Sequence, residues 1–280
     1  MIIGTQLFGF MKELTEDMAG TFHGLKAAGF DLVEGLLRMR DTQDGEQKNN
    51  WAMDTLKEAK EICDAEGLML RSAHICHVPE DTPAKIAEYL AKAREIAGMP
   101  IFVFSGMFGD EERSKRYGAF VAEIMEESDR AGIGKDITFL YHNHAMEFTR
   151  TGENRFALDA VLEEAGPRLK LELDFGWADY AGVSLQELER YLDRVQIVHL
   201  KDFHRITKDI STLEARTEAF AIIGEGTAPI RETLKVTQTL KDWTGYVILD
   251  QDYSPYGMVE TLSRGYQNVC GMLKELDIPR

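Results

Sequence analysis

Short β-rich runs alternate with longer amphipathic stretches along all 280 residues, eight of each. The predicted strands are residues 2–8, 31–35, 69–74, 101–105, 137–142, 170–174, 196–200 and 246–250. The predicted helices include residues 51–66, 83–97, 113–131, 185–192, 230–240 and 258–276. Such alternation produces a parallel sheet with right-handed crossovers, and eight units are the number that closes a barrel. The sequence therefore predicts an α/β fold, a (β/α)8 barrel, with residues 1–280 forming one domain.

A doubly wound open sheet is the structural alternative to a barrel. That fold usually carries a glycine-rich phosphate turn after its first strand. Here the first strand runs into LFGF, and no GxGxxG follows it. The missing dinucleotide fingerprint favours the barrel, and it also counts against a cofactor-dependent oxidoreductase.

The charge balance excludes several classes of partner. Lys and Arg total 32 against 48 Asp and Glu, which gives a formal net charge of −16. We therefore expect no binding to nucleic acid and no attraction to an anionic membrane surface, and a small neutral or metal-bridged substrate fits better. The N-terminus has no basic region before its short apolar stretch, and no run approaches the roughly 18 apolar residues of a membrane span. We expect a cytoplasmic protein.

The three cysteines indicate neither a disulfide framework nor a CxxC metal site, because they are odd in number and widely spaced. Cys76 lies close to His74 and His77, so a reactive thiol is one interpretation. A small reduced side chain near a strand end is the interpretation that we favour.

Polar groups follow four of the predicted strands. The sequence YHNHAME begins at Tyr141, LKLELD ends at Asp174, VQIVHLKD contains His199, and YVILDQD contains Asp250. Because all strands of a parallel barrel point the same way, groups at their carboxyl ends converge on one mouth. Each residue alone could be a turn cap or a buried core residue, but four polar strand ends together favour an active site.

A carboxylate, an imidazole and a second carboxylate suit a divalent cation. We expect Asp174, His199 and Asp250 to bind it, with the fourth ligand coming from YHNHAME. Lys201 points to the same side of its strand as His199 and could stabilise an oxyanion, whereas an ordinary surface ion pair with Asp202 is the alternative.

At this point the chain resembles a known group of enzymes. YHNHAMEF, ELDFGWADYAG, VHLKD, IGEGTAPI and VILDQD, in this order, are similar to motifs of the sugar phosphate isomerase/epimerase group of xylose isomerase-like TIM barrels. VEG at residues 33–35 and SAH at residues 72–74 are similar to that group's second and third strand ends. The group includes ketose 3-epimerases, hydroxypyruvate isomerases, inosose dehydratases and enzymes acting on 3-keto-glycosides.

The resemblance implies a metal held by Glu, Asp, His and Glu. Asp174 and His199 match the second and third positions, and Asp250 stands where the group usually has Glu. Glu147 is our first choice for the first position, with His142 and His144 as alternatives. Mn²⁺ is the expected ion, with Zn²⁺, Co²⁺ or Mg²⁺ as the other candidates.

Residues expected to contact a sugar-like substrate are Glu34, His74, Trp177, Asp202 and Glu225. Trp177 replaces a histidine found in many epimerase-type relatives, so it would offer a stacking wall. Glu225 lies between two glycines that let the backbone approach a ligand, although GEG could equally be a plain turn.

Together these features predict a metal-dependent isomerase or epimerase that removes the proton α to a carbonyl and passes through a metal-stabilised enediolate. The base would be His142, His144 or Glu147, and Lys201 would assist the oxyanion. One alternative is a dehydratase or lyase of an inosose or a 3-keto-glycoside, and another is a non-catalytic barrel subunit with a degenerate metal site. A phosphodiesterase is disfavoured, because it would need a basic surface and a richer zinc cluster. This chain is strongly acidic and has seven histidines in all. An assembly of identical chains is expected by resemblance.

Overall fold

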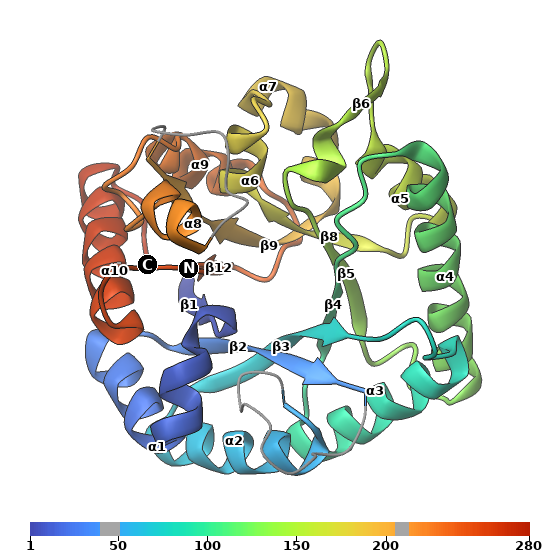
Figure 1. Cartoon of the computed structure of the whole chain (residues 1–280), viewed down its shortest axis with the longest axis horizontal. Helices are drawn as coiled ribbons and strands as arrows, with labels where there is room; N and C mark the ends of the chain where they lie inside the picture. Colours follow the sequence, from blue (N-terminus) through green and yellow to red (C-terminus); the bar gives the residue numbers. More distant parts are fainter. Residues whose placement is uncertain (40–50, 205–212) are drawn as a thin grey trace.

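The computed structural model describes residues 1–39, 51–204 and 213–280. Eight parallel strands close into a barrel in the order β1-β12-β9-β8-β5-β4-β3-β2 (Figure 1). These strands are β1 Ile2–Gln6, β2 Leu32–Arg38, β3 Met69–Cys76, β4 Ile101–Phe104, β5 Thr138–His142, β8 Lys170–Asp174, β9 Val195–Leu200 and β12 Tyr246–Leu249. The first strand pairs with the last, Ile2 opposite Tyr246, so the barrel has no open edge. The predicted (β/α)8 TIM barrel is confirmed.

Helices surround the barrel on its outside (Figure 1). The larger ones are α1 Met11–Ala28, α2 Met53–Glu66, α3 Pro83–Ala97, α4 Glu111–Arg130, α5 Ala157–Ala165, α9 Ile230–Val236 and α10 Met258–Glu275. Shorter elements are α6 Phe175–Tyr180, α7 Leu185–Leu188, α8 Leu213–Ala219, and the 3-10 helices η1 Phe8–Phe10, η2 Met146–Phe148, η3 Glu189–Arg194 and η4 Thr237–Thr239. Two small antiparallel pairs, β6 Arg150–Gly152 with β7 Arg155–Phe156 and β10 Asp202–Phe203 with β11 Phe220–Ala221, lie in the loops after β5 and β9.

Local sequence signals explain where a helix such as α3 begins and ends. The hydroxyl of Thr82 accepts a hydrogen bond from the backbone N–H of Lys85, and Pro83 occupies the first turn, where its missing N–H costs nothing. The helix ends at Gly98, whose φ of 63° lies in the left-handed region that glycine adopts without strain.

Three predicted helices begin later or are divided in the structure. The helix expected from residue 51 begins only at Met53, because Trp51 extends the sheet: its N–H donates to Leu36 O at 2.6 Å, and Arg38 N–H donates to Trp51 O at 2.9 Å. The expected helix over residues 185–192 is divided into α7 and the 3-10 helix η3, and the one over residues 230–240 is divided into α9 and the 3-10 helix η4. The late start at Met53 comes from pairing with β2, which helical periodicity cannot reveal.

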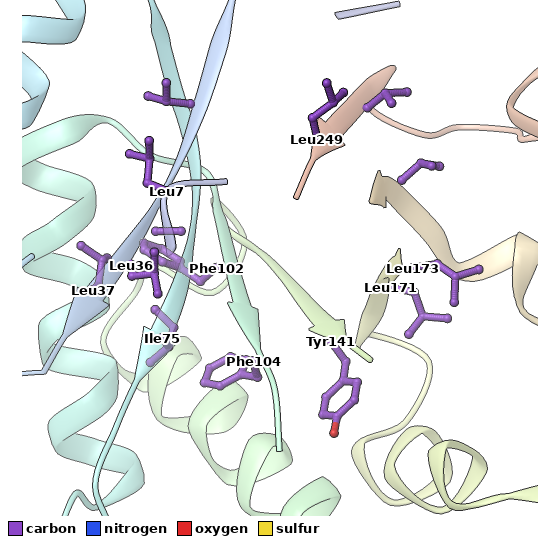
Figure 2. Close-up of a cluster of buried hydrophobic side chains, with 14 of the residues drawn as sticks. Leu7, Leu36, Leu37, Ile75, Phe102, Phe104, Tyr141, Leu171, Leu173 and Leu249 are labelled. Atoms are coloured by element: carbon purple, nitrogen blue, oxygen red, sulfur yellow. The ribbon is translucent and has the colours of Figure 1, made fainter. Parts of the chain in front are cut away.

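The main hydrophobic core lies between the barrel and its helices. Figure 2 shows part of it, with Phe102 and Phe104 on β4 and Tyr141 on β5 among neighbouring leucines. Tyr141 reaches Tyr117 of α4, with ring centroids 6.1 Å apart. Within the described ranges, no helix combines the length and the apolar character needed to cross a membrane.

Candidate active site

The inside of the barrel has an apolar floor with polar side chains beyond it. The floor consists of the buried residues Leu32, Ile101, Val103, Leu140, Ile197 and Ile248. Two positions after four of these residues, the chain carries Glu34, His142, His199 and Asp250. Because residues two apart in a strand point to the same face, the pleat directs these polar groups inward, toward the carboxyl ends of the strands.

Four side chains from different strands converge on one point. They are His142 at the end of β5, Asp174 at the end of β8, His199 in β9 and Asp250 directly after β12. One potential ligand atom of each lies within 4.8 Å of those of the other three, and all four residues are buried. We call this set the upper cluster. The predicted residues Asp174, His199 and Asp250 are thus brought together.

Glu147, expected to supply the fourth ligand, lies outside the upper cluster. The hydroxyl of Tyr141 donates to its Oε1 at 2.8 Å, and the backbone N–H of His144 donates to its Oε2 at 3.0 Å. Burial raises the pKa of the Glu147 carboxyl. Glu147 therefore closes the turn after β5, and His142, one of the two alternatives, stands in the place expected for Glu147.

Two carboxylates of the upper cluster retain unused acceptor capacity. Asp174 Oδ2 and Asp250 Oδ1 are buried and have no hydrogen-bond partner among the described residues. The other oxygen of Asp174 accepts the backbone N–H of Trp177 at 2.7 Å and so caps α6. Asp174 is therefore both a helix cap and a member of the cluster, whereas the sequence presented these as competing interpretations.

Asn143 orients Asp174 and was missed by sequence reasoning. Its side-chain nitrogen donates to the Asp174 carbonyl, and its side-chain oxygen accepts the Asp174 N–H, both at 3.0 Å. This reciprocal pair fixes the end of β8 against the loop after β5. Asn143 lies inside YHNHAME, but nothing in the sequence indicated a role for an amide side chain between two histidines.

A second set of buried ionisable groups adjoins the upper cluster. Glu172 Oε1 lies 2.7 Å from His74 Nε2, 3.1 Å from His142 Nδ1 and 3.1 Å from His199 Nε2. Glu34 Oε1 lies 3.1 Å from His199 Nε2 and 3.2 Å from His74 Nε2. Among these residues, His74, His142, Glu172 and His199 form a second group with metal-ligand spacing.

Glu172 is another functional candidate that sequence reasoning missed. It precedes Asp174 by two residues and is completely buried, so strand alternation alone places both carboxylates on the same face. That spacing in LKLELD was the available signal. Its Oε2 has no hydrogen-bond partner among the described residues.

Opposite charges stabilise one another around His74. Burial alone would lower the pKa of His74, but Glu172 and Glu34 raise it to about 10. For Glu34, burial alone would raise the pKa, yet His74 and His199 hold it well below the usual value. Opposite charges therefore hold this part of the site together as an imidazolium–carboxylate network.

Lys201 supplies a positive charge beside the upper cluster. Its ammonium lies 2.9 Å from Asp250 Oδ2 and 2.9 Å from Asp252 Oδ2, and its side chain is 2% exposed. Burial alone would lower the pKa of Lys201, but Asp250, Asp252 and Asp174 raise it. Asp252, two residues beyond Asp250, belongs to the same polar strand end in the sequence, and the structure pairs it with Lys201.

The pKa values within the upper cluster differ for physical reasons. Burial raises the pKa of Asp174 to about 7, whereas for Asp250 the nearby Lys201 and His199 overcome burial and hold the pKa well below the usual value. Burial together with His199 lowers the pKa of His142 well below its usual value. His142 is consequently neutral at pH 7, the form in which imidazole binds a cation.

Aromatic side chains form one wall of the mouth. Trp177 packs against Phe203 with ring centroids 5.0 Å apart, and its ring lies 4.9 Å from the Lys201 ammonium. The ring centroids of His144 and Trp177 lie 5.9 Å apart. Burial, and to a smaller extent the positive charge of Lys201, lowers the pKa of His144 to about 3. His144 Nδ1 and Trp177 Nε1 are buried without a partner among the described residues.

Asp202 and Glu225, expected to contact substrate, are engaged elsewhere. Both oxygens of Asp202 accept backbone N–H groups, from Phe203 and Ala228 on one side and from Gly224 and Gly226 on the other. Asp202 therefore organises the loop after β11. Glu225 forms a surface ion pair with Arg264 of α10 at 2.8 Å.

Comparison with known proteins agrees with this architecture. The family described as xylose isomerase-like TIM barrel matches residues 22–276. Inosose dehydratase 2 of Bacillus cereus is 24% identical over 187 residues, which is 62% of this chain and 60% of that relative. The matched part thus spans about three fifths of the relative's own length.

Solved structures are similar over nearly the whole chain. A sugar phosphate isomerase/epimerase from Parabacteroides distasonis has a TM-score of 0.68 at 21% identity, covering 95% of this chain and 92% of that one. The IolI protein, solved with a zinc atom, has a TM-score of 0.66 at 14% identity, and the match covers 99% of this chain and 98% of that one. These likenesses describe the fold, and the family match extends from α1 to α10. The chain belongs to the xylose isomerase-like TIM barrel family.

Proposed function

We propose that this protein is an enzyme that binds a divalent metal ion and removes the proton α to a carbonyl group of a sugar- or inositol-like substrate. The observation that carries this proposal is the upper cluster, in which Asp174 Oδ2 and Asp250 Oδ1 have no partner among the residues that the structure describes. A buried acceptor without a donor is costly, and a cation is a partner that suits two carboxylates at once.

The chemistry of the donor set fits a divalent ion. His142, Asp174, His199 and Asp250 offer two imidazoles and two carboxylates, a combination suited to Zn²⁺, Mn²⁺ or Co²⁺. The neighbouring carboxylates of Glu34 and Glu172 add negative charge. When bound, the ion would act as a Lewis acid that polarises the substrate carbonyl. Mn²⁺ is the ion that we expect, with Zn²⁺, Co²⁺ or Mg²⁺ as the other candidates.

The chain's own residues would hold the substrate and move its proton. The flat face of Trp177 would form a wall against a sugar ring, and the Lys201 ammonium would stabilise negative charge on a substrate oxygen. Because its pKa is lowered to about 3, His144 is neutral at pH 7, and its unpartnered Nδ1 would accept the proton. Glu147 would act indirectly, by holding the turn that carries His144.

The fate of the substrate after proton removal decides the reaction class. Return of a proton gives an isomerase or an epimerase, and loss of a β-substituent gives a dehydratase or another lyase. The relatives named inosose dehydratase support the second outcome, and the sugar phosphate isomerase/epimerase fold supports the first. A barrel subunit without catalytic activity is the remaining candidate, because His142 and Asp250 both depart from the glutamates of the resembled group.

Solvent exchange tests this proposal directly. The Mn²⁺-loaded protein is incubated in D₂O with an inosose, a ketose and a 3-keto-glycoside, and deuterium at the carbon next to the carbonyl is followed by NMR. We expect exchange or elimination with at least one substrate, and a rate at least 100-fold lower, in order of magnitude, for Asp174→Asn. Protein that retains metal but gives neither exchange nor elimination with any of the three would support the non-catalytic subunit.

A further inference from the structure

A cavity of about 450 Å³ lies at the same end of the barrel as the upper cluster but is lined by different residues. His77, in the loop after β3, forms one side. Phe108, in the loop after β4, and Tyr117 and Phe120 of α4 form the others. Figure 1 shows that the loops leaving β3 and β4 are neighbours at the barrel rim. We call this cavity the rim pocket.

The walls of the rim pocket are aromatic and hold one another in place. His77 stacks on Tyr117 with centroids 5.8 Å apart and planes 19° from parallel. The ring centroid of Phe120 lies 5.2 Å from that of His77, and the ring centroid of Phe108 lies 5.1 Å from that of Tyr117. Flat walls that are already packed favour a planar, apolar ligand group, because little side-chain freedom would be lost on binding.

The charged residues that line the rim pocket, among those that the structure describes, are Arg113 and Arg116. Their partners are weak surface contacts: Arg113 Nε lies 3.6 Å from Asp110, and Arg116 Nη1 lies 3.3 Å from Glu112. The side chains of Arg113 and Arg116 are 67% and 69% exposed, so these pairs contribute little. Two guanidinium groups at one cavity in a chain of net charge −16 suit an anionic ligand.

The ring of His77 also retains a polar atom that the fold does not use. Its Nε2 lies 3.2 Å from the hydroxyl oxygen of Tyr117, and that hydroxyl donates to Ser105 O at 3.0 Å. Its Nδ1 is buried and has no hydrogen-bond partner in the described parts of the chain. An aromatic cavity with two weakly engaged arginines and an unused ring nitrogen has the composition of a ligand site.

We propose that the rim pocket binds a small aromatic anion, a planar ring that carries a carboxylate or a phosphate. The ring lies against Tyr117, Phe120 and His77, and the anionic group lies against Arg113 and Arg116. The site does not depend on the reaction proposed above, since none of these residues belongs to the upper cluster.

Binding of simple probes tests this site. Benzoate and phenyl phosphate are titrated into the protein by isothermal calorimetry or ligand-observed NMR, beside benzamide, cyclohexanecarboxylate and acetate. We expect a Kd on the order of 1 mM for the better aromatic anion. Benzamide, which lacks the charge, and cyclohexanecarboxylate, which lacks the flat ring, should bind at least about fivefold more weakly. The ratio of benzoate to phenyl phosphate affinity identifies the anionic group.

Variants locate the bound anion. Arg113→Gln combined with Arg116→Gln should weaken binding of the aromatic anion about fivefold or more and leave benzamide unchanged. Arg130→Gln, a 65% exposed arginine at the other end of α4, is the matched control and should change nothing. Asp174→Asn should also bind the anion normally, which separates the rim pocket from the upper cluster. Equal affinity for benzamide and benzoate, an unaffected double variant, or no binding at 10 mM (about ten times the expected Kd) would overturn the proposal.

Discussion

Asp202 is a buried carboxylate whose two oxygens accept four backbone N–H groups. Replacing it with asparagine turns one acceptor into a donor and leaves two of these N–H groups without a partner. We expect Asp202→Asn to lower the free energy of unfolding by about 3 kcal/mol. Urea denaturation followed by circular dichroism measures this change.

Glu225→Gln is the comparison for Asp202→Asn. The Glu225 carboxylate and the Arg264 guanidinium are 38% and 41% exposed, so water screens their attraction. Loss of this pair should change the free energy of unfolding by no more than about 0.5 kcal/mol. If Asp202→Asn had the same free energy of unfolding as the unmodified protein but lost activity, contact with substrate would become the better explanation of the role of Asp202.

Cys63 and Cys76 should be unreactive in the folded protein. Burial raises the pKa of Cys63 to about 12 and that of Cys76 to about 11. At pH 8 only about one Cys76 thiol in 1,000 would be the reactive thiolate, and this fraction rises about tenfold per pH unit. We expect iodoacetamide at pH 8 to spare both residues in native protein and to modify all three cysteines in 6 M guanidinium chloride, a concentration above the roughly 5 M that marks hyperstable proteins.

Peptide mapping by mass spectrometry reads out this experiment. Cys270 is half-buried and serves as the internal comparison. Rapid modification of Cys76 at neutral pH would instead support the reactive thiol that its position near His74 and His77 first suggested.

The packing of α4 against α5 depends on Gly118 in α4. A Cβ built on Gly118 would lie 2.5 Å from Val161 O, a backbone atom of α5 that cannot move without shifting the helix. Gly118→Ala should therefore separate α4 from α5 and destabilise the protein by about 1–3 kcal/mol. The free energy of unfolding in urea is the measurement.

Gly271 in α10 provides the matched substitution. It is exposed, and a Cβ there would meet nothing within 4 Å. Gly271→Ala should stabilise the protein by about 0.5–1 kcal/mol, because alanine favours a helix over the unfolded chain more than glycine does. Equal effects of the two substitutions would show that intrinsic helix propensity, rather than the α4–α5 contact, governs Gly118.

For the whole molecule, metal binding should be coupled to stability. Four strands supply the residues of the upper cluster, so the ion would bind the closed barrel and not the unfolded chain. A ligand at 100 times its Kd adds about 2.7 kcal/mol, which corresponds to a rise in Tm of roughly 5–10 °C for a chain of this size. Calorimetry of chelator-treated protein with and without added Mn²⁺ or Zn²⁺ measures this shift.

Two histidine variants distinguish a specific site from general binding of cations to an acidic surface. His199→Ala removes a buried member of the upper cluster and should reduce the shift in Tm to below about 1 °C. His204→Ala, whose side chain is half-buried in the loop after β10, should keep the full shift. A full shift in both variants would mean that the ion binds elsewhere.

Periodicity in the sequence was enough to predict the barrel and the inward face of its strands. The eight runs and their intervening helices follow from local hydrophobic patterns, which the chain carries whatever its tertiary contacts are. The same two-residue period places Asp250 above Ile248 and His199 above Ile197. Asp174, His199 and Asp250 could therefore be named in advance, because position along a strand determines which face a side chain occupies.

Only the tertiary structure decided among neighbouring candidates. His142 joins the upper cluster while Glu147 closes a turn, and Glu172 meets His74, which is 98 residues away in the chain. Asp202 and Glu225, equally polar in the sequence, are engaged by backbone N–H groups and by Arg264. The physical reason is that partners of this kind depend on strand register and side-chain direction across the closed barrel, which a local pattern does not contain.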